Sequence, residues 1–326
     1  MAEDHVKDPF EVTSDPSASN PNTTFPLEGR DIFKVSESEL AAIADTAPSL
    51  HTLSGARVAR ISRNLVIKKS MLTLPSEAEA MKLVSQRTSI HLPRVYRSFT
   101  VYGTGGIYDS TGYIIMDYID GICLSECWEK LLPNEREDVI RQVVDMIREL
   151  QSLHLPFVGP IGGGPSHGKW FSIYGSGPFT GVSDFEEYCN GRLEMAKTTG
   201  NTPTCTPPFK FSSFVMIHQD IAPRNLLLHP SGRLYLIDWG CAGAYPPIFE
   251  AAAIARESDD DGFSHSVLQR LEYNQQALQQ LMGIRAVLHF FNETDVEKLE
   301  VWMKSRQTKP IDKVSDRFPT PNKTSA

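Results

Sequence analysis

The sequence predicts an α+β fold of two lobes, in which a small antiparallel sheet with one main helix precedes a larger, mostly helical lobe. The length of 326 residues is enough for two such lobes. Strand-like patterns occur at 57–69 and 112–119, on either side of a helical pattern at 75–86. Long apolar stripes at helical spacing follow at 135–154 and 266–291, and each predicts one long helix.

Further elements fit the same plan. Ser36 and Glu39 match the capping-box pattern, which predicts a short helix from that point. Residues 57–69 are expected to fold back near Arg63-Asn64 as two strands, and 91–102 are expected to be extended. Another helix is expected near 184–198 in the second lobe.

Composition sets the expected domain boundaries. Residues 1–29 and 304–326 are rich in polar and small side chains, so we expect them to be disordered tails. The first lobe, expected to bind nucleotide, is assigned to 30–119. The second lobe, expected to carry the catalytic and acceptor-binding groups, is assigned to 120–303.

Charge and cysteine content exclude several classes of protein. The chain has 32 basic and 40 acidic side chains, a net charge of −8, and no long basic run, which argues against nucleic-acid and membrane-surface partners. No apolar run is long enough to span a membrane, and the polar, acidic amino terminus does not resemble a secretory signal. Five scattered cysteines without a CxxC pair indicate reduced thiols and no zinc site. We therefore expect a cytoplasmic protein.

The most informative segment is 214–250, which contains a predicted β-hairpin. Residues 225–228 and 234–238 flank a turn whose expected tip is Ser231-Gly232. That register places Asn225 opposite Asp238, with Cβ atoms about 5 Å apart. An amide oxygen and a carboxylate at such a distance suit a shared Mg²⁺ ion.

Asp220 lies five residues before Asn225 on a predicted loop. The spacing is H-x-D-x-x-x-x-N from His218 to Asn225, followed by Asp238 at the far end of the hairpin. In phosphoryl transfer the first aspartate accepts the proton of the acceptor hydroxyl, and the asparagine and second aspartate hold the metal on the phosphates. The coordinated spacing of three polar positions favours this chemistry over a chance turn and cap.

These motifs give the chain, from about 50 to 300, a resemblance to the aminoglycoside phosphotransferase and choline-kinase-like branch of the protein-kinase fold. Within that branch, Ile237-Asp238-Trp239-Gly240, Ala242-Gly243 and Tyr245-Pro246-Pro247 resemble a fungal-type subgroup. The resemblance implies ATP and Mg²⁺ as cofactors, with Asp220 as the base and with Asn225 and Asp238 as metal ligands.

The resemblance also implies a phosphate-binding lysine in the first lobe. Lys68 matches this residue, because it shares a strand face with Val66, whereas Lys69 points the other way. The glutamate that orients the lysine maps onto Glu77, with Glu79 as the alternative. Without the motif downstream, an exposed lysine and a solvated acid would be the simpler interpretation.

Adenine binding is expected at the end of the strand 112–119. There the resemblance makes Met116 the gatekeeper and places the backbone groups of Asp117, Tyr118 and Ile119 next to the base. Such a run is also typical of an ordinary core strand. A glycine-rich phosphate loop is marked only by Ser54-Gly55-Ala56.

One apparent phosphate loop is rejected. Residues 163–169 match GxxxxGK, but Trp170 stands where Ser or Thr is required, and neither a strand before nor a helix after is predicted. We expect a surface loop there.

The acceptor is expected to be a small molecule with a hydroxyl group, with amino alcohols and amino sugars among the candidates. Only a few residues separate Trp239 from 246–250, too few for the peptide platform of a protein kinase. The resemblance implies acidic residues that bind amino groups of the acceptor, and a solvated acidic loop is the simpler alternative. The candidates are Glu250, Glu257, Asp259, Asp260 and Asp261.

The sequence therefore predicts a small-molecule kinase. A catalytically silent, kinase-like binding or regulatory protein is the alternative, and a protein kinase comes third.

Overall fold

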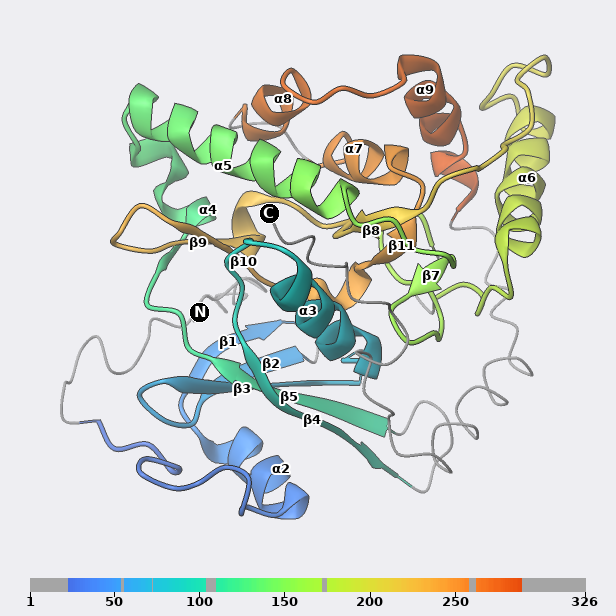
Figure 1. Ribbon diagram of the computed structural model, residues 1–326. Helices are drawn as coiled ribbons and strands as arrows, with labels where there is room; N and C mark the ends of the chain where they lie inside the picture. Colours follow the sequence, from blue (N-terminus) through green and yellow to red (C-terminus); the bar gives the residue numbers. More distant parts are fainter. Residues whose placement is uncertain are drawn as a thin grey trace, which may run out of the picture.

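The computed structural model describes residues 23–53, 56–71, 73–103, 110–171, 175–257 and 262–288. Figure 1 shows the two lobes, with the sheet lobe at the bottom and the helical lobe at the top. Most of the expected tails lie outside the described residues. Phe25 and Leu27 are buried, however, so the folded part begins before the predicted boundary at residue 30.

The first lobe is a five-stranded antiparallel sheet in the order β1-β2-β3-β5-β4. Helices α2 and α3 lie on opposite sides of it (Figure 1). The strands and helices are α2 (Glu37–Thr46), β1 (Ser49–Leu53), β2 (Ala56–Arg60), β3 (Leu65–Ser70), α3 (Pro75–Arg87), β4 (Val95–Tyr102) and β5 (Ser110–Asp117).

Local sequence accounts for these elements. The Ser36 side chain accepts a hydrogen bond from the Glu39 N–H, which begins α2 where the capping pattern predicts. Alternation along β3 sends Val66 into the core on the α3 side and Ile67 into the core on the α2 side. The predicted strands at 57–69 and the helix beginning at Pro75 are confirmed.

The helices of the second lobe include the two predicted at 135–154 and 184–198. The long helical elements are α5 (Pro133–Gln151) and α6 (Val182–Thr198), and the shorter ones are α4 (Leu124–Cys127), η1 (Trp128–Lys130), α7 (Ile248–Ile254), α8 (Phe263–Leu268), α9 (Gln275–Gly283) and η4 (Arg285–Val287). Along α5 the residues at helical spacing are buried, which explains why this helix was readable from the sequence.

The single long helix predicted at 266–291 is wrong. The chain instead forms α8 and α9 with an irregular stretch between them. Asn274 breaks the pattern because its side chain accepts a hydrogen bond from the Ala277 N–H and so begins a new helix. Residues 289–291 lie outside the described part of the chain.

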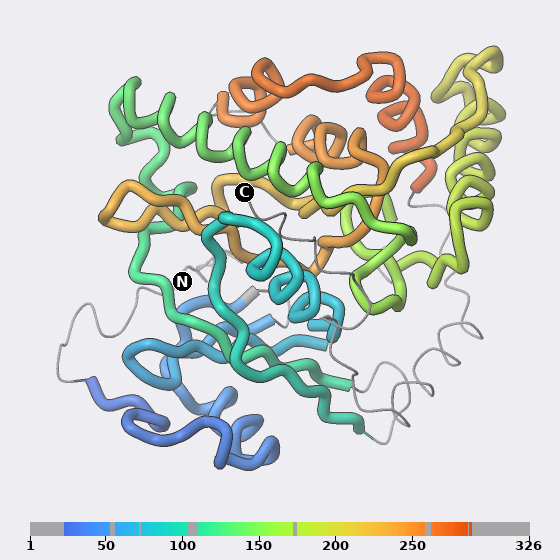
Figure 2. The backbone as a smooth tube through the Cα atoms, in the orientation of Figure 1, coloured from blue at the N-terminus to red at the C-terminus, as the bar shows by residue number. Residues whose placement is uncertain are grey.

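Two small three-stranded sheets, β10-β9-β6 and β7-β11-β8, carry the motif segment. Figure 2 shows this segment (gold) beside the green chain that leaves the first lobe, where β6 pairs with β9. The elements are β6 (Ile122–Cys123), β7 (Gly159–Pro160), β8 (Val215–Ile217), η2 (Pro223–Asn225), β9 (Leu226–Leu228), β10 (Leu234–Leu236), η3 (Trp239–Cys241) and β11 (Gly243–Tyr245).

The buried apolar side chains form two clusters. The larger cluster joins α3 to the second lobe, because Met81 and Val84 belong to it together with Ile147 and Trp239. The smaller cluster lies between the sheet and α2, around Leu40. The packing of α3 against the second lobe thus fixes the position of the segment 214–250 relative to β3. Among the described helices, none has the length and apolar character needed to cross a membrane.

Candidate active site

The predicted hairpin is present, but its register differs by one residue from the prediction. Leu226 pairs with Leu236, and the Ile237 N–H donates to the Asn225 carbonyl at 3.0 Å. Asn225 therefore faces Ile237, and the predicted direct pairing of Asn225 with Asp238 is wrong.

The hairpin loop explains this shift. His229 and Arg233 are joined by a hydrogen bond (3.0 Å), so three residues form the loop rather than two. Gly232 closes the loop in the left-handed conformation, with φ +81°. This is the three-residue hairpin loop that ends in a left-handed glycine.

Asp238 comes after the last paired residue of β10 and has a left-handed backbone, with φ 63°. Such a conformation costs about 1–2 kcal/mol in a residue other than glycine, and strained positions of this kind gather at functional sites. The turn brings the Asp238 carboxylate to the first lobe, where its Oδ1 accepts a hydrogen bond from Lys68 Nζ at 2.7 Å. Asp238 thus connects the hairpin to β3.

Lys68 lies between two carboxylates. Its Nζ is 2.7 Å from Glu77 Oε1 on α3 and 2.7 Å from Asp238 Oδ1. The alternative residues are engaged elsewhere, since Lys69 pairs with Asp45 on α2 and Glu79 accepts from Lys82 at 3.1 Å. The structure brings Lys68 and Glu77 together, and places Lys69 and Glu79 outside this contact.

Each carboxylate of this trio stabilises the charge of Lys68, whereas burial and the nearby Asp238 carboxylate raise the pKa of Glu77. Burial alone would lower the pKa of Lys68, but Glu77 and Asp238 together raise the pKa above its ordinary value. The nearby Lys68 ammonium lowers the pKa of Asp238 to about 2. At neutral pH the lysine is therefore cationic and Asp238 is a carboxylate, the states required to bind phosphate and metal.

The loop between β8 and η2 is organised around the buried His218. Burial lowers the pKa of His218 to about 4, so the imidazole is neutral at pH 7. Its Nδ1 accepts from the Asp220 N–H (3.2 Å), so Nε2 carries the proton and donates to the Ile237 carbonyl (3.1 Å). His218 thereby ties the Asp220 backbone to the hairpin.

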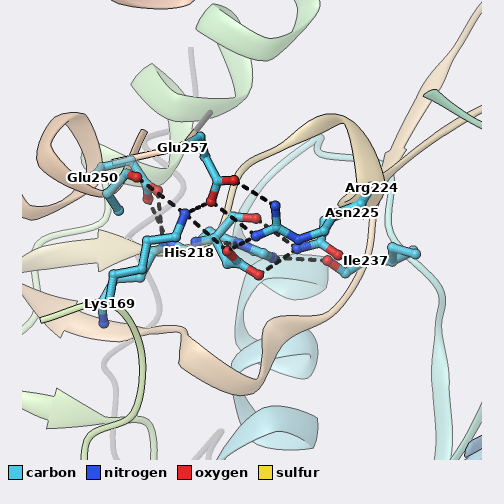
Figure 3. Close-up of polar contacts among 10 residues, drawn as sticks. Lys169, His218, Arg224, Asn225, Ile237, Glu250 and Glu257 are labelled. Atoms are coloured by element: carbon cyan, nitrogen blue, oxygen red, sulfur yellow. Dashed lines mark hydrogen bonds and ion pairs between the residues drawn. The ribbon is translucent and has the colours of Figure 1, made fainter. Parts of the chain in front are cut away.

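Glu250, at the start of α7, holds the same loop from the other side. Its carboxylate accepts from the N–H groups of His218 (2.6 Å) and Gln219 (3.0 Å), and Gln219 has a left-handed φ of 66°. Burial raises the pKa of Glu250 to about 7. Because both oxygens bind backbone amides, this candidate for acceptor binding acts in the structure as a support for the loop (Figure 3).

Asp220 and Asn225 lie in direct contact. Asn225 Nδ2 donates to the Asp220 carbonyl (2.8 Å) and to Asp220 Oδ2 (2.7 Å). Both amide hydrogens are therefore used, which leaves Asn225 Oδ1 as the atom available to a ligand.

The donor set fits Mg²⁺. Asn225 offers an amide oxygen, and the Asp238 side chain is 50% exposed and keeps one carboxylate oxygen beyond its bond to Lys68. Mg²⁺ takes one or two such protein oxygens and completes its shell with phosphates and water. Within the described part of the chain, no group of three or more His, Cys, Asp or Glu side chains is placed to hold a metal ion.

A second charged cluster, which the sequence did not reveal, surrounds Asp220. Lys169 Nζ lies 3.2 Å from Asp220 Oδ1, and Arg224 also donates to that oxygen. Glu257 pairs with both cations, and its bonds to Arg224 are 2.7 and 3.1 Å long (Figure 3). The predicted amino-binding carboxylate of Glu257 is thus neutralised within the protein.

The expected surface loop at 163–169 is therefore wrong. Ser166 and Trp170 are buried, and Lys169 reaches the candidate base. One reason for rejecting a phosphate loop was wrong, because the short strand β7 does end at Pro160, just before this segment. The rejection still rests on Trp170 in place of Ser or Thr and on the distance to the next described helix, α6, which begins at Val182. A signal was available in the sequence, because Trp170 and Phe171 form a large apolar pair that must be buried and so must draw its neighbour inward.

At the end of β5, two of the backbone N–H groups expected to bind adenine already donate to carbonyls of the protein. The Asp117 N–H donates to the Arg94 carbonyl (3.1 Å) and the Tyr118 N–H donates to the Asn64 carbonyl (2.8 Å). Met116 is buried in the larger cluster, as a gatekeeper would be. The Ile119 carbonyl accepts from Gly121 (3.0 Å). Adenine recognition through the first two amides would require their present bonds to open.

Some expected site residues cannot be placed. Ser54 and Gly55 of the sparse phosphate loop, and Asp259, Asp260 and Asp261 of the acidic run, lie outside the described residues.

Comparisons with known proteins agree with this architecture. Residues 204–286 match a sequence model described as "Phosphotransferase enzyme family" (APH). No curated protein matches the chain. The fungal-type subgroup is not addressed by these matches and stays a prediction.

Solved structures match over most of the chain. The gentamicin complex of APH(2")-IIa is 14% identical, with a TM-score of 0.50 over 85% of this chain and 97% of that one. The aminoglycoside phosphotransferase APH(4)-Ia is 15% identical, with a TM-score of 0.50 over 82% of this chain and 95% of that one. The predicted two-lobed α+β fold is confirmed: this chain has the fold of these aminoglycoside phosphotransferases.

Proposed function

We propose that this chain is an ATP- and Mg²⁺-dependent phosphotransferase that moves the γ-phosphoryl group to a hydroxyl of a small molecule. The observation that carries the proposal is the placement of Lys68 between Glu77 and Asp238, at 2.7 Å from each carboxylate. These three residues come from β3, from α3 and from the end of the hairpin, which lies far from the other two elements in the sequence. The fold brings them together next to the Asp220–Asn225 pair. The family match over 204–286 supports the same chemistry.

Each residue then has a defined task. Lys68, oriented by Glu77, binds phosphate oxygens, and Asp220 accepts the proton of the attacking hydroxyl. Asn225 and Asp238 hold Mg²⁺, which neutralises charge on the phosphates when it is bound. His218 and Glu250 fix the loop that carries Asp220, through the backbone hydrogen bonds described above.

A small acceptor fits the segment after Asp238 better than a peptide. Between Asp238 and α7 the chain forms η3 and then β11, which pairs with both β7 and β8. This short, paired segment leaves no long loop on which a peptide substrate could be displayed, as protein kinases require. The candidates are small alcohols, including amino alcohols and amino sugars.

A catalytically silent binding or regulatory protein is the second candidate. The observation that favours it is that the Asp117 and Tyr118 amides donate to protein carbonyls, at the place where adenine would pair. A silent protein of this kind would lack a response to Mg²⁺–ATP.

The first experiment is a thermal shift with ATP, in the presence and absence of Mg²⁺. We expect Mg²⁺-dependent stabilisation, because a ligand at 100 times its Kd adds about 2.7 kcal/mol to the free energy of unfolding. ADP release is then screened against aminoglycosides, choline-like amines, sugars and natural-product alcohols. If Mg²⁺ makes no difference to the shift, the silent interpretation is favoured.

Asp220→Asn tests the assigned base. The amide cannot accept the proton, so we expect turnover with any active acceptor to fall by about 10²–10⁴-fold while ATP affinity stays within about twofold. Asp138→Asn, an exposed aspartate on α5, is the matched control and should keep wild-type turnover. Retained turnover in Asp220→Asn would contradict the assignment.

A further inference from the structure

We infer that Lys169 is a further catalytic residue, which binds an oxygen of the transferring phosphoryl group beside Asp220, and that Glu257 positions it. The inference rests on the proposed function, but it concerns a residue outside the Lys68 trio and outside the motif from His218 to Asn225.

Three contacts fix the Lys169 ammonium. Nζ lies 3.2 Å from Asp220 Oδ1, donates to the Ala253 carbonyl of α7 at 3.2 Å, and pairs with Glu257 (Figure 3). The neighbouring Trp170 is fully buried, which anchors the backbone of the loop. Only 20% of the Lys169 side chain is exposed. Holding a lysine side chain in one conformation costs entropy, so these contacts must offset that cost.

The chemistry of transfer places the phosphoryl group within reach of this ammonium. The acceptor oxygen gives its proton to Asp220 and forms a bond to the γ-phosphorus, while the bond from that phosphorus to the bridging oxygen breaks and its electron pair leaves on ADP. The phosphoryl group therefore lies just beyond an oxygen that touches Asp220. A cation that already contacts the same carboxylate can turn to the equatorial phosphoryl oxygens, where negative charge must be stabilised. Lys169 gives up no proton in this step.

The rest of the site leaves this task open. Lys68 is held by Glu77 and Asp238, and between Asp220 and Asn225 the only cationic residue is Arg224. The Arg224 side chain is 47% exposed, whereas that of Lys169 is 20% exposed. Electrostatic interactions are stronger where water is excluded, so the more buried cation is the better placed of the two.

Glu257 explains how the cations stay in place as Asp220 changes partners. Asp220 Oδ1 is in contact with Lys169 and Arg224, and Oδ2 accepts from Asn225, which leaves one lone pair on Oδ2 for the acceptor hydroxyl. Once that lone pair has taken up the proton of the hydroxyl, Asp220 is neutral and holds the two cations less strongly. Glu257 pairs with both cations and its side chain is 14% exposed. Each cation can release Asp220 without leaving the site, which makes Glu257 a positioning residue.

The test uses Mg²⁺–ADP with fluoroaluminate, a planar mimic of the transferring phosphoryl group. Two quantities are measured with a fluorescent ADP: the affinity for Mg²⁺–ADP alone, and the slowing of its release when fluoroaluminate is added. In Lys169→Met we expect the slowing to fall by about 10²–10³-fold, as when one preorganised donor is lost, with Mg²⁺–ADP affinity within about twofold of wild type. Lys169→Arg keeps the charge and should restore most of the effect.

Lys210→Met is the matched control, because Lys210 is also ion-paired, with Glu186 at 2.9 Å, but lies on the surface. It should behave as wild type. Glu257→Gln should weaken fluoroaluminate trapping less than Lys169→Met does. If Lys169→Met does not fold, Lys169→Gln is compared with Lys169→Arg, since these differ in charge while both keep N–H donors.

The outcomes separate the two proposals. If wild type fails to bind Mg²⁺–ADP, the proposed function fails and this inference falls with it. If wild type binds Mg²⁺–ADP and traps fluoroaluminate, but Lys169→Met traps it equally well, the role of Lys169 is overturned and the proposed function stands. An equal loss of Mg²⁺–ADP affinity and trapping in Lys169→Met indicates a structural ion pair and also overturns the inference, as does a wild type that gains nothing from fluoroaluminate.

Discussion

Lys68 shows how far one residue can be placed from its sequence. Strand alternation predicts that Lys68 and Val66 share a face and that Lys69 lies on the other, and the contacts of Lys68 with Glu77 and of Lys69 with Asp45 confirm this. The choice between Glu77 and Glu79 could not be made from sequence, because it depends on the rotation of α3 about its own axis. Packing against the second lobe sets that rotation.

Replacing each lysine in turn tests this assignment. We expect Lys68→Met to reduce Mg²⁺–ATP affinity at least about tenfold, since a charge-assisted hydrogen bond to phosphate contributes about 1.5–3 kcal/mol. Lys69→Met removes a lysine on the opposite face and should leave the affinity within about twofold. Titration calorimetry measures both, and a larger loss in Lys69→Met would reverse the assignment.

His167 provides a pH-dependent test at the residue scale. Burial lowers its pKa to about 4, and its Nε2 has no hydrogen-bond partner among the residues that the structure describes. An unfolded histidine titrates near pH 6.5, so as pH falls from 6.5 to 4 the unfolded state binds an extra proton and stability is lost. The effect amounts to as much as about 3 kcal/mol, from about 2.5 pH units at 1.36 kcal/mol each.

The measurement compares His167→Gln with wild type by chemical denaturation between pH 8 and pH 4. At pH 8 the difference between the two proteins reflects packing alone. Below pH 6.5 the free energy of unfolding of wild type should fall relative to that of the variant. A difference that stays constant with pH would show that His167 takes up a proton equally well in both states.

Two residues of the site were beyond the reach of sequence reasoning for a physical reason. Lys169 lies 51 positions before Asp220, and its approach depends on how the loop after β7 packs beneath α7. Glu250 was considered for acceptor binding, but its role depends on two backbone amides, those of His218 and Gln219, that the loop turns toward it. The apolar pair Trp170-Phe171 indicates only that this part of the loop is buried, and no local pattern identifies the partners of Lys169 and Glu250.

At the scale of elements, the hairpin β9–β10 was predictable and its register was predicted wrongly. The prediction assumed a two-residue turn at Ser231-Gly232, which pairs Asn225 with Asp238 instead of with Ile237. Pro230 fits the first central position of a type I turn, and Gly232 fits the left-handed position that follows in a three-residue loop. The proline was therefore a usable signal for the observed register.

Two glycine substitutions test the conformations of these elements. Gly232→Ala places a side chain at φ +81° with no steric contact, so we expect a loss of about 1 kcal/mol from backbone strain alone. Gly191→Ala, in the exposed middle of α6, should instead stabilise the protein by up to about 1 kcal/mol. Urea denaturation of both variants gives the comparison, and effects of equal sign would contradict it.

The division of 266–291 into α8 and α9 shows a second kind of limit. Apolar spacing alone continues across the break, so periodicity predicted one helix. Asn274, a strong helix-capping residue, marked the start of the second helix and outweighed the periodicity.

At the scale of the whole molecule, the order of a sheet-rich part and a helix-rich part was enough to predict two lobes. What the sequence could not show is that α3 shares its core with the second lobe while α2 covers a separate cluster. That arrangement depends on contacts between segments far apart in the chain.

The separate cluster leads to a prediction about stability. Leu40 is fully buried under the sheet, on the side away from the Lys68 trio. Leu40→Ala should lower the free energy of unfolding by about 2–5 kcal/mol. Leu132→Ala removes a leucine that is 61% exposed and should change it by less than about 0.5 kcal/mol.

Nucleotide affinity, measured well below the melting temperature, should be unchanged in both leucine variants. A loss of affinity in Leu40→Ala comparable to that in Lys68→Met would show that the α2 side of the sheet is coupled to the site.

The ion pair between Lys68 and Asp238 makes two ligands depend on each other. A polyphosphate that draws the ammonium away frees the carboxylate for a divalent cation, and a cation on Asp238 releases the ammonium for the polyphosphate. Such heterotropic cooperativity is reciprocal, so each ligand raises the affinity for the other by the same factor. The site therefore favours a polyphosphate and a divalent cation bound together over either one bound alone.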